Sequence, residues 1–315
     1  GYSDNNMIGG AYKAQIALVQ TEESEWEKLV EEANWMRGAE WADSLGTDVI
    51  QSSLGYSQFD LSYYDHQYNQ LNGNTTLVTK AANWATDRGI ICVISAGNEG
   101  TSAWKYITAP ADALDILSVG AVSSSLTKIG FSSLGPTSDG RLKPDVCALG
   151  TGVRAADSDG SFGYFSGTSF SAPLVSSLVA GLLEQYPKHK ASVIKEIVRK
   201  SSHLVASPNN SLGNGVPSYE KAVELLTPVL STNSTPDNSI SIFPNPVEIG
   251  GNIHLSSSNK VPYEVEIINI HGQSIIQFNW EGEEKNISLG PVLAGKYFFR
   301  IKSASLLQII PIIVY

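Results

Sequence analysis

Apolar runs and helix-like stretches alternate along roughly the first two thirds of the chain. Apolar residues recur at helical spacing over residues 24–45 and again over residues 77–88. Strands buried on both faces read as short continuous apolar runs, and they alternate with helices where a parallel sheet is covered on both sides. We therefore predict an α/β domain with helices on both faces of a parallel sheet, whose strands lie at residues 14–19, 48–52, 90–95, 116–122 and 145–149.

The pattern changes at about residue 240, beyond which apolar and polar residues alternate with a period of two. The preceding stretch, residues 229–239, is rich in Pro, Ser, Thr and Asn and holds little that a core could bury. We predict an α/β domain at residues 1–228, a linker at 229–239 and a small antiparallel β-sandwich at 240–315. Its strands are expected at residues 240–243, 264–270, 274–278, 286–289, 296–301 and 306–314.

The composition excludes several classes of function. The 315 residues are 42% hydrophobic and 17% charged, which is typical of a globular protein. The formal net charge of -10 has the wrong sign for binding nucleic-acid phosphates or anionic lipid, so no nucleic-acid partner is expected. No uninterrupted apolar stretch reaches the ~18 residues of a membrane-spanning helix. The chain begins at Gly1 without an initiator Met or an export signal, and we interpret it as part of a longer polypeptide.

A glycine, a serine and a proline stand at the expected start of a strongly apolar helix. Gly167 permits a tight turn, Ser169 follows two places later, and Pro173 is interpreted as part of the first helical turn, where a missing N–H is tolerated. The apolar residues after it predict a largely buried helix. A serine hydroxyl at the positive end of such a helix is suited to attack a carbonyl, because the resulting oxyanion is stabilised there. An ordinary helix N-cap serine is the alternative.

A side-chain amide follows one of the predicted strands. The strand at residues 90–95 runs into small residues and then into Asn98, at the carboxyl end of the strand, where α/β proteins bind ligands. The amide of an asparagine is a donor of the kind found in oxyanion holes. The alternative is a turn residue stabilised by its own side chain, a common use of Asn next to Gly.

Motifs in four stretches carry a family resemblance. Residues 167–173 are similar to the nucleophile motif Gly-Thr-Ser-(Met/Phe)-Ala-x-Pro and depart from it at Ser171, where alanine is usual. Residues 95–100 are similar to an oxyanion motif, and residues 131–136 with 139–146 are similar to the stretch that precedes the nucleophile. In their order and spacing these motifs resemble those of the subtilases, the subtilisin-like serine peptidases.

The resemblance covers residues 1 to about 225. It implies a subtilisin-like fold and a serine endopeptidase that acts on protein or peptide substrates. Ser169 would be the nucleophile that forms the acyl-enzyme, and the Asn98 amide and the Ser169 N–H would bind the oxyanion. Backbone on two sides of the substrate cleft would come from Ser53, Leu54, Gly55, Ser95, Ala96 and Gly97.

The general base and the acid that orients it are not visible. In the resembled family both precede the serine, the base being a His followed by Gly-Thr, and none of the five histidines here is followed by Gly-Thr. His66 alone precedes Ser169, and it is interpreted as a solvated loop histidine rather than as the base. Residues 7–14 look like the stretch after the family's His helix, so both groups are expected upstream of Gly1. A catalytically inactive, subtilase-like surface-binding protein is the alternative.

Metal and cofactor sites are not assigned. The insertion at residues 55–74 carries five aromatic residues and two aspartates. It is interpreted as a surface loop packed by its own aromatics, with a cap over the cleft or a structural calcium site as alternatives. The paired glutamates at 22–23 and 31–32 are expected on a solvated helix face. Cys92 and Cys147 are expected to be buried free thiols. No metal and no cofactor are therefore predicted.

The last domain carries three motifs. Residues 243–246 read Phe-Pro-Asn-Pro, residues 272–273 form a Gly-Gln turn, and residues 294–300 read Ala-Gly-Lys-Tyr-Phe-Phe-Arg. These look like the C-terminal sorting domain of bacterial proteins exported by the type IX secretion route. The resemblance implies secretion machinery as a partner of residues 240–315 and a secreted or cell-surface location. A generic adhesive or carbohydrate-binding sandwich is the alternative.

Overall fold

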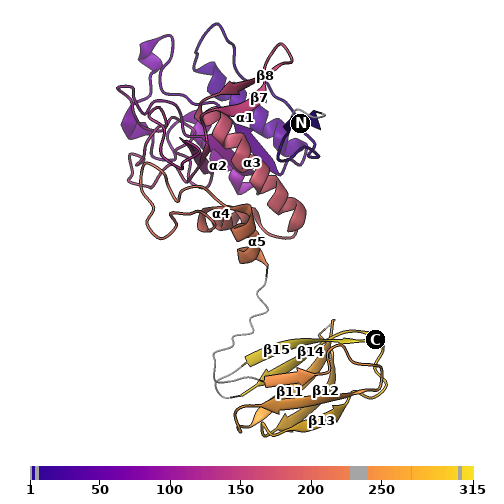
Figure 1. The fold of residues 1–315 in the computed structure, drawn as a ribbon. Helices are drawn as coiled ribbons and strands as arrows, with labels where there is room; N and C mark the ends of the chain where they lie inside the picture. Colours follow the sequence, from indigo (N-terminus) through magenta and orange to yellow (C-terminus); the bar gives the residue numbers. More distant parts are fainter. Residues whose placement is uncertain (1, 4–6, 228–239, 271, 304–306) are drawn as a thin grey trace. The chain divides into compact units, whose positions relative to one another are not determined.

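Two compact units make up the chain (Figure 1). The computed structural model describes residues 2–3, 7–227, 240–270, 272–303 and 307–315. Gly1–Leu226 forms one unit and Thr227–Tyr315 the other. The linker expected at residues 229–239 lies outside the described residues, so its limits stay a prediction.

The first unit is built around a parallel sheet of four strands. In sheet order these are β3 (Val49–Ser52), β4 (Ile91–Ser95), β5 (Leu117–Val122) and β6 (Val146–Leu149), each parallel to its neighbour. β4 and β5 are buried along their whole length. Their continuous apolar sequences follow from this burial, because neither face of the sheet meets water there. Four of the five predicted strands are thereby confirmed.

Helices cover both faces of the sheet, as predicted. The described helices are α1 (Val30–Ser44), α2 (Leu77–Asp87), α3 (Thr168–Gln185), α4 (Ala191–Lys200) and α5 (Tyr219–Leu226). Alternate residues of β4 belong to the two layers: Cys92 and Ile94 pack with α1 and α2, while Ile91 and Val93 pack with the other three helices. α3 is less buried than predicted, since Leu174 is 42% exposed. None of the described helices has both the length and the hydrophobicity that crossing a membrane requires.

Residues 14–19, predicted to form a strand, have no regular secondary structure. Ile16 and Leu18 are 69% and 89% exposed. A strand is held by hydrogen bonds to a neighbouring chain, and no described strand pairs with this segment. A short apolar run is therefore not enough to make a strand here. Further upstream, a short ladder joins β1 (Tyr2–Ser3) to β2 (Met7–Ile8).

The prediction of a solvated glutamate face on α1 is wrong. Glu31 and Glu32 are 1% and 0% exposed. The Glu31 carboxylate accepts hydrogen bonds from the backbone N–H groups of Glu23, at 2.9 Å, and Lys28, at 2.8 Å. The Glu32 carboxylate accepts one from the N–H of Val78 at 3.1 Å. These bonds hold the preceding segment in turns and tie α1 to α2, which explains why α1 starts later than its sequence periodicity indicated.

The insertion at residues 55–74 packs into the unit and not only on itself. Tyr56 and Leu71 are buried in the core that α1 and α2 share. The ring of Tyr68 stacks on Tyr106 with centroids 4.1 Å apart. The prediction of a loop packed by its own aromatics is therefore correct only in part, because the insertion also packs against the core. Its regular structure is limited to two short 3₁₀ turns, η1 (Ser62–Tyr64) and η2 (Tyr68–Gln70).

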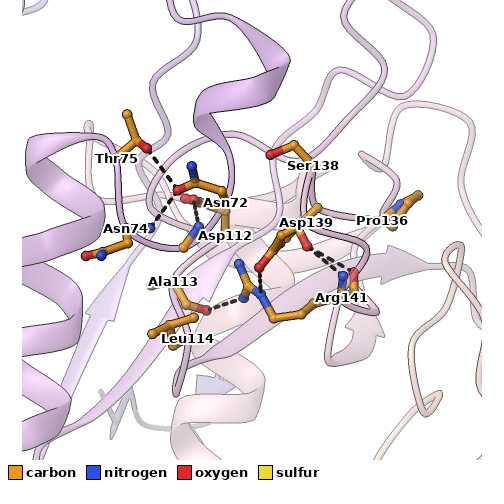
Figure 2. Close-up of polar contacts among 12 residues, drawn as sticks. Asn72, Asn74, Thr75, Asp112, Ala113, Leu114, Pro136, Ser138, Asp139 and Arg141 are labelled. Carbon is orange, nitrogen blue, oxygen red and sulfur yellow. Dashed lines mark hydrogen bonds and ion pairs between the residues drawn. The ribbon is translucent and has the colours of Figure 1, made fainter.

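Figure 2 shows the region where the end of the insertion meets a loop from later in the chain. In that loop Arg141 donates to the Asp139 carboxylate at 2.8 Å and to the carbonyl of Ala113 at 3.3 Å. The backbone N–H of Ser138 donates to the Leu71 carbonyl at 2.9 Å. The insertion is thus joined to this loop by a backbone hydrogen bond at its end.

The second unit is a small antiparallel β domain, as predicted. One sheet has the order β13 (Lys285–Ser288), β10 (Asn252–Ser257), β9 (Ile240–Phe243). The other has the order β12 (Ser274–Trp280), β11 (Tyr263–Asn269), β14 (Gly295–Lys302), β15 (Leu307–Val314). Side chains of both sheets share one core. β10 was not predicted, because only Ile253 and Leu255 of its residues are large and apolar; both are completely buried.

A buried ion network lies where the chain enters β6. The Asp145 carboxylate bonds the Lys143 ammonium at 2.6 Å, the Arg199 Nε at 2.9 Å and the N–H of Ser118 at 2.8 Å. Lys143 is 2% exposed and Asp145 is 8% exposed. Burial alone would raise the pKa of Asp145, but the charges of Lys143 and Arg199 outweigh it and hold the pKa below its usual value. The network therefore requires an ionised aspartate.

We expect Asp145→Asn to lower the free energy of unfolding by about 3–5 kcal/mol at neutral pH, because it leaves the Lys143 ammonium buried without its counter-charge. A depressed pKa stabilises the fold above the unfolded-state pKa, and this contribution is lost as the pH falls through the folded-state pKa. The difference between the two proteins should therefore shrink in acid. Urea unfolding followed by circular dichroism at several pH values measures it. The control Glu196→Gln breaks the exposed pair with Lys200 and should change little.

Candidate active site

The chain enters α3 through a hairpin and a glycine. The hairpin pairs β7 (Val153–Ala156) with β8 (Phe162–Phe165). Gly167 follows with φ at +149°, a backbone conformation that residues with side chains rarely adopt. α3 begins at the next residue, Thr168. Ser169 therefore lies in the first turn of the helix, at its positive end.

Pro173 lies inside α3 and not in its first turn, as had been predicted, because the helix begins earlier than expected. A proline has no N–H to bond the carbonyl four residues before it, which here is the carbonyl of Ser169. The hydroxyl of Ser53 donates to that carbonyl at 2.8 Å. The Ser169 hydroxyl in turn donates to the Ser53 carbonyl in a long contact of 3.4 Å. Two serines thus join the segment after β3 to the start of α3.

Asn98 reaches the start of the same helix from the end of β4. Its Oδ1 accepts hydrogen bonds from the backbone N–H of Thr168, at 2.9 Å, and from the Thr168 hydroxyl, at 3.0 Å. Because these two donors occupy Oδ1, the amide Nδ2 faces the other way. A Cβ built on Gly167 would lie 3.7 Å from the Asn98 Nδ2 and 3.7 Å from the Ser169 N. The Asn98 Nδ2 and the Ser169 backbone N, from distant parts of the sequence, therefore both lie close to Gly167.

The two predicted substrate-binding segments differ in how their backbone is used. Within the described chain, Leu54 and Gly55 make no backbone hydrogen bond, so their N–H and C=O groups are free to pair with an extended peptide. In the other segment, the N–H of Ala96 donates to Val119 and its carbonyl accepts from Thr108. The backbone of Leu54 and Gly55 is thus unpaired within the described chain, whereas that of Ala96 is bonded at both its N–H and its carbonyl.

His66 is not the solvated histidine that was predicted. It is 7% exposed, and its Nε2 lies 2.5 Å from the Glu32 carboxylate. Its ring packs edge-on against Phe59, with centroids 5.3 Å apart. The pair joins the insertion, through His66, to α1, through Glu32, so His66 has a structural role. No histidine in the described part of the chain is bonded to the Ser169 hydroxyl.

Both cysteines are buried free thiols, as predicted. Burial raises the pKa of Cys92 to about 12, and burial raises that of Cys147 to about 12 as well. A thiol with such a pKa stays protonated at neutral pH and is a poor nucleophile. Unlike the two cysteines, Ser169 at the start of α3 has the Asn98 amide and a backbone N–H close to it.

A comparison with known protein families covers most of the first unit. The profile of the "Subtilase family" matches residues 1–215. The chain belongs to the subtilase family. It is therefore a relative of the subtilisin-like serine peptidases, and the fold expected from its motifs is confirmed.

Curated relatives align with this subtilase over part of their length. Subtilisin NAT of Bacillus subtilis subsp. natto is 33% identical over 156 residues, which are 49% of this chain and 35% of that protein. Subtilisin of Bacillus pumilus is 29% identical over 176 residues, 55% of this chain and 56% of that protein. The chain thus spans about a third to about a half of these relatives.

Solved structures share the fold. The prenylagaramide maturation protease PagA has a TM-score of 0.53 at 22% identity, with 66% of this chain and 72% of that chain covered. The self-cleaved protease domain of PatA has a TM-score of 0.51 at 23% identity, covering 62% of this chain and 67% of that chain. At these identities the likeness speaks for the architecture of the sheet and its helices.

The second unit of the subtilase matches the profile of the "Secretion system C-terminal sorting domain" over residues 241–315. This confirms the resemblance to a type IX sorting domain that its motifs carry. A domain of this kind indicates a secreted or cell-surface protein.

Sequence reasoning missed one threonine near the site. Thr168 was quoted as part of the nucleophile motif, but its bonds to the Asn98 Oδ1 were not foreseen. The family motif contains the signal, because a threonine directly before the serine offers both a backbone N–H and a hydroxyl to the Asn98 Oδ1.

Three carboxylates gather near the start of α1. Oxygens of Glu22, Glu27 and Glu31 lie within 4.8 Å of one another. Both oxygens of Glu31 already accept backbone hydrogen bonds. Burial, followed by the charges of Glu31, Glu22 and Asp60, raises the pKa of Glu27 to about 7. The cluster is a site of carboxylate repulsion, and we assign no metal to it.

We expect Glu27→Gln to stabilise the subtilase at pH 8 and to have little effect at pH 4. A raised folded-state pKa means that the folded protein holds a proton that the unfolded chain has lost, so stability falls as the pH rises from about 4.5 to about 7. The variant has no charge to repel. Thermal unfolding across this range measures the effect, with the exposed Glu25→Gln as control. A difference between wild type and Glu27→Gln that does not change with pH contradicts this account.

Proposed function

We propose that this subtilase is a serine endopeptidase with Ser169 as its nucleophile. The Ser169 hydroxyl gives its proton to the general base as it attacks the carbonyl of a peptide bond, and the base passes that proton to the leaving amine. Water then hydrolyses the acyl-enzyme and returns the serine hydroxyl. The observation that supports the proposal is that the Asn98 Nδ2 and the Ser169 backbone N both lie close to Gly167, at the start of α3.

The oxyanion formed in this attack is held by the two donors. Thr168 fixes the orientation of the Asn98 amide by occupying its Oδ1, so Nδ2 is ready before the reaction begins. Donors that need no rearrangement stabilise developing charge most effectively. The positive end of α3 adds to the same effect. The free backbone of Leu54 and Gly55 supports binding of the substrate as an added strand.

The base and acid of the triad come, in this proposal, from upstream of Gly1. Two observations support it. Residues 7–14 resemble the stretch after the family's His helix. β3 pairs only with β4 in the described sheet, which leaves its other edge available for one more strand. Residues 1–315 alone should therefore hydrolyse peptides slowly, because removing the base costs most of the rate.

A catalytically inactive surface-binding protein is the second candidate. The observation in its favour is that the Ser169 hydroxyl bonds a carbonyl and no histidine within the described residues. If the subtilase is a serine endopeptidase, its substrates are proteins or peptides outside the cell, and residues 240–315 engage the secretion machinery. Reactivity of Ser169 separates the two candidates.

We expect the protein as its gene encodes it to be labelled stoichiometrically by a fluorescent peptidyl phosphonate, and Ser169→Ala to abolish the labelling. The phosphonate reacts with an activated serine hydroxyl, so an inactive relative would remain unlabelled. In-gel fluorescence and the mass of the intact protein measure the adduct. The matched control is Ser171→Ala, which removes the hydroxyl two residues further along the helix that donates to the Leu149 carbonyl. Labelling that persists in Ser169→Ala contradicts the proposal.

We also expect Asn98→Ala to lower kcat by about 10²–10³-fold with little change in KM, the range found when the corresponding donor is removed from a subtilisin. The reason is that the amide binds an oxyanion present only in the transition state. Steady-state kinetics on a peptide p-nitroanilide measure both constants. Thr168→Val is the comparison: it keeps the backbone N–H bond to Oδ1 and should cost less. If KM rises by this factor while kcat stays unchanged, the amide instead contributes to binding of the substrate in its ground state.

A further inference from the structure

The Pro-Asn-Pro motif lies where the chain crosses from one sheet of the second unit to the other. It follows β9 of the first sheet, and just beyond it Val247 forms a parallel bridge with Val314 of β15 in the second sheet. Pro244 and Pro246 have no N–H, so the backbone on either side of Asn245 cannot donate to a neighbouring strand. Within the motif, hydrogen bonds to β15 are made by the Asn245 side chain.

The amide of Asn245 bonds β15 at two points. Its Nδ2 donates to the carbonyl of Pro311 at 2.9 Å, and its Oδ1 accepts from the N–H of Ile313 at 3.0 Å. A side-chain amide offers a donor and an acceptor, as a peptide unit does, so it pairs as a strand residue would. Backbone pairing follows at Val247, whose N–H donates to the Ile313 carbonyl at 2.9 Å and whose carbonyl accepts from Tyr315 at 3.1 Å. β15 therefore has this segment on one side and β14 on the other.

The hydrophobic pattern of β15 does not define how the strand pairs with β14. A strand with one buried face normally alternates apolar and polar residues, because a slip by one residue would then expose its apolar side chains. In β15 two pairs of adjacent isoleucines break this alternation, at residues 309–310 and 312–313. In the second pair Ile312 is completely buried, whereas Ile313 is 50% exposed. A slip by one residue exchanges one isoleucine for another, so burial opposes it only weakly.

Asn245 and Pro311 together select one register. The N–H groups of Ile313 and Tyr315 donate to residues 245 and 247, on the side of β15 away from β14. Alternation along the strand places the nitrogen of Pro311 on this same side, where its missing N–H costs no bond to β14. After a slip by one residue, the proline would face β14 and a bond between the strands would be lost. After a slip that moved Pro311 to the place of Ile313, it could not donate to the Asn245 Oδ1.

We propose that Asn245 is a positioning residue for sorting, which fixes the register of β15 and so keeps the second unit in the form that the secretion machinery accepts. The proposal rests on the role of residues 240–315 in secretion proposed above. The register decides which side chains β15 presents: Ile309 and Ile313 are 41% and 50% exposed and would turn inward after a slip by one residue. The profile of the sorting domain covers both the motif and β15.

Hydrogen exchange of the purified protein, as its gene encodes it, tests the effect of Asn245 on β15 directly. In Asn245→Ala the N–H of Ile313 loses its acceptor and should exchange about 5–30-fold faster, the weight of one to two neutral hydrogen bonds. The matched control is Asn286→Ala, which removes an exposed asparagine of the other sheet, bonded to the His254 ring at 2.9 Å. It should leave this exchange unchanged. Mass spectrometry with fragmentation of the deuterated peptides resolves the amide, and unchanged exchange in Asn245→Ala overturns the proposal.

Export is measured in a bacterium with a type IX secretion system, as the share of the protein found outside the cell or on its surface. Asn245→Ala should lower this share at least about fivefold, and Asn286→Ala should not. Ile253→Val controls for stability, because it removes a methyl group from a completely buried side chain of β10 and does not touch β15. If Asn245→Ala loses no more export than Ile253→Val at the same melting temperature, Asn245 acts on stability alone and the proposal is wrong.

A disulfide between β14 and β15 provides a rescue. Lys296 and Ile313 are register partners, and they form a non-hydrogen-bonded pair because the N–H and carbonyl of Ile313 bond to the opposite side of β15. Side chains of such pairs lie close enough for a disulfide, which forms in the oxidising periplasm. Lys296→Cys with Ile313→Cys therefore locks the native register, and adding Asn245→Ala should then no longer lower the exported share.

The outcomes separate this role of Asn245 from the sorting function itself. If wild type is exported and the loss in Asn245→Ala persists in the locked background, the register is not what export requires and the proposal is wrong, while the sorting function stands. If Asn245→Ala is exported as well as wild type, the conclusion is the same. If wild type itself stays in the periplasm, both proposals fall.

Discussion

The helix that carries Ser169 cannot satisfy that residue's own carbonyl, because the position four residues later is Pro173. The carbonyl is bonded instead by the hydroxyl of Ser53, at the end of another strand. The bond that the proline removes inside the helix is thereby replaced by one that joins the helix start to the segment after β3.

The orientation of Asn98 also depends on the hydrogen bonds available at the start of α3. Parallel strands end at one edge of the sheet, so the segments after β3 and β4 meet near the start of α3. An amide at that edge is able to point either way, and the two donors of Thr168 decide which end of it faces the helix. The donor pair beside Gly167 is thus a product of sheet topology, one helix start and one threonine.

The sequence predicts well what depends on continuous local pattern. Fully buried strands such as β4 appear as unbroken apolar runs, and the motif around Ser169 is local enough to be recognised directly. What failed depends on partners that lie far away along the chain. A strand at residues 14–19 needs a neighbour that the described chain does not provide. From the sequence, Glu32 and His66 read as solvated polar residues, but in the folded chain each is buried against the other.

The departure from the family motif at Ser171 has a physical consequence of its own. The Ser171 hydroxyl donates to the Leu149 carbonyl at 3.2 Å, at the end of β6, where an alanine would leave that carbonyl without this bond. A Cβ on the following Gly150 would lie 2.5 Å from the same hydroxyl, so the close approach depends on a glycine there. β6 begins beside the buried carboxylate of Asp145. β6 thus has a buried ion network at its start and a hydrogen bond to the first turn of α3 at its end.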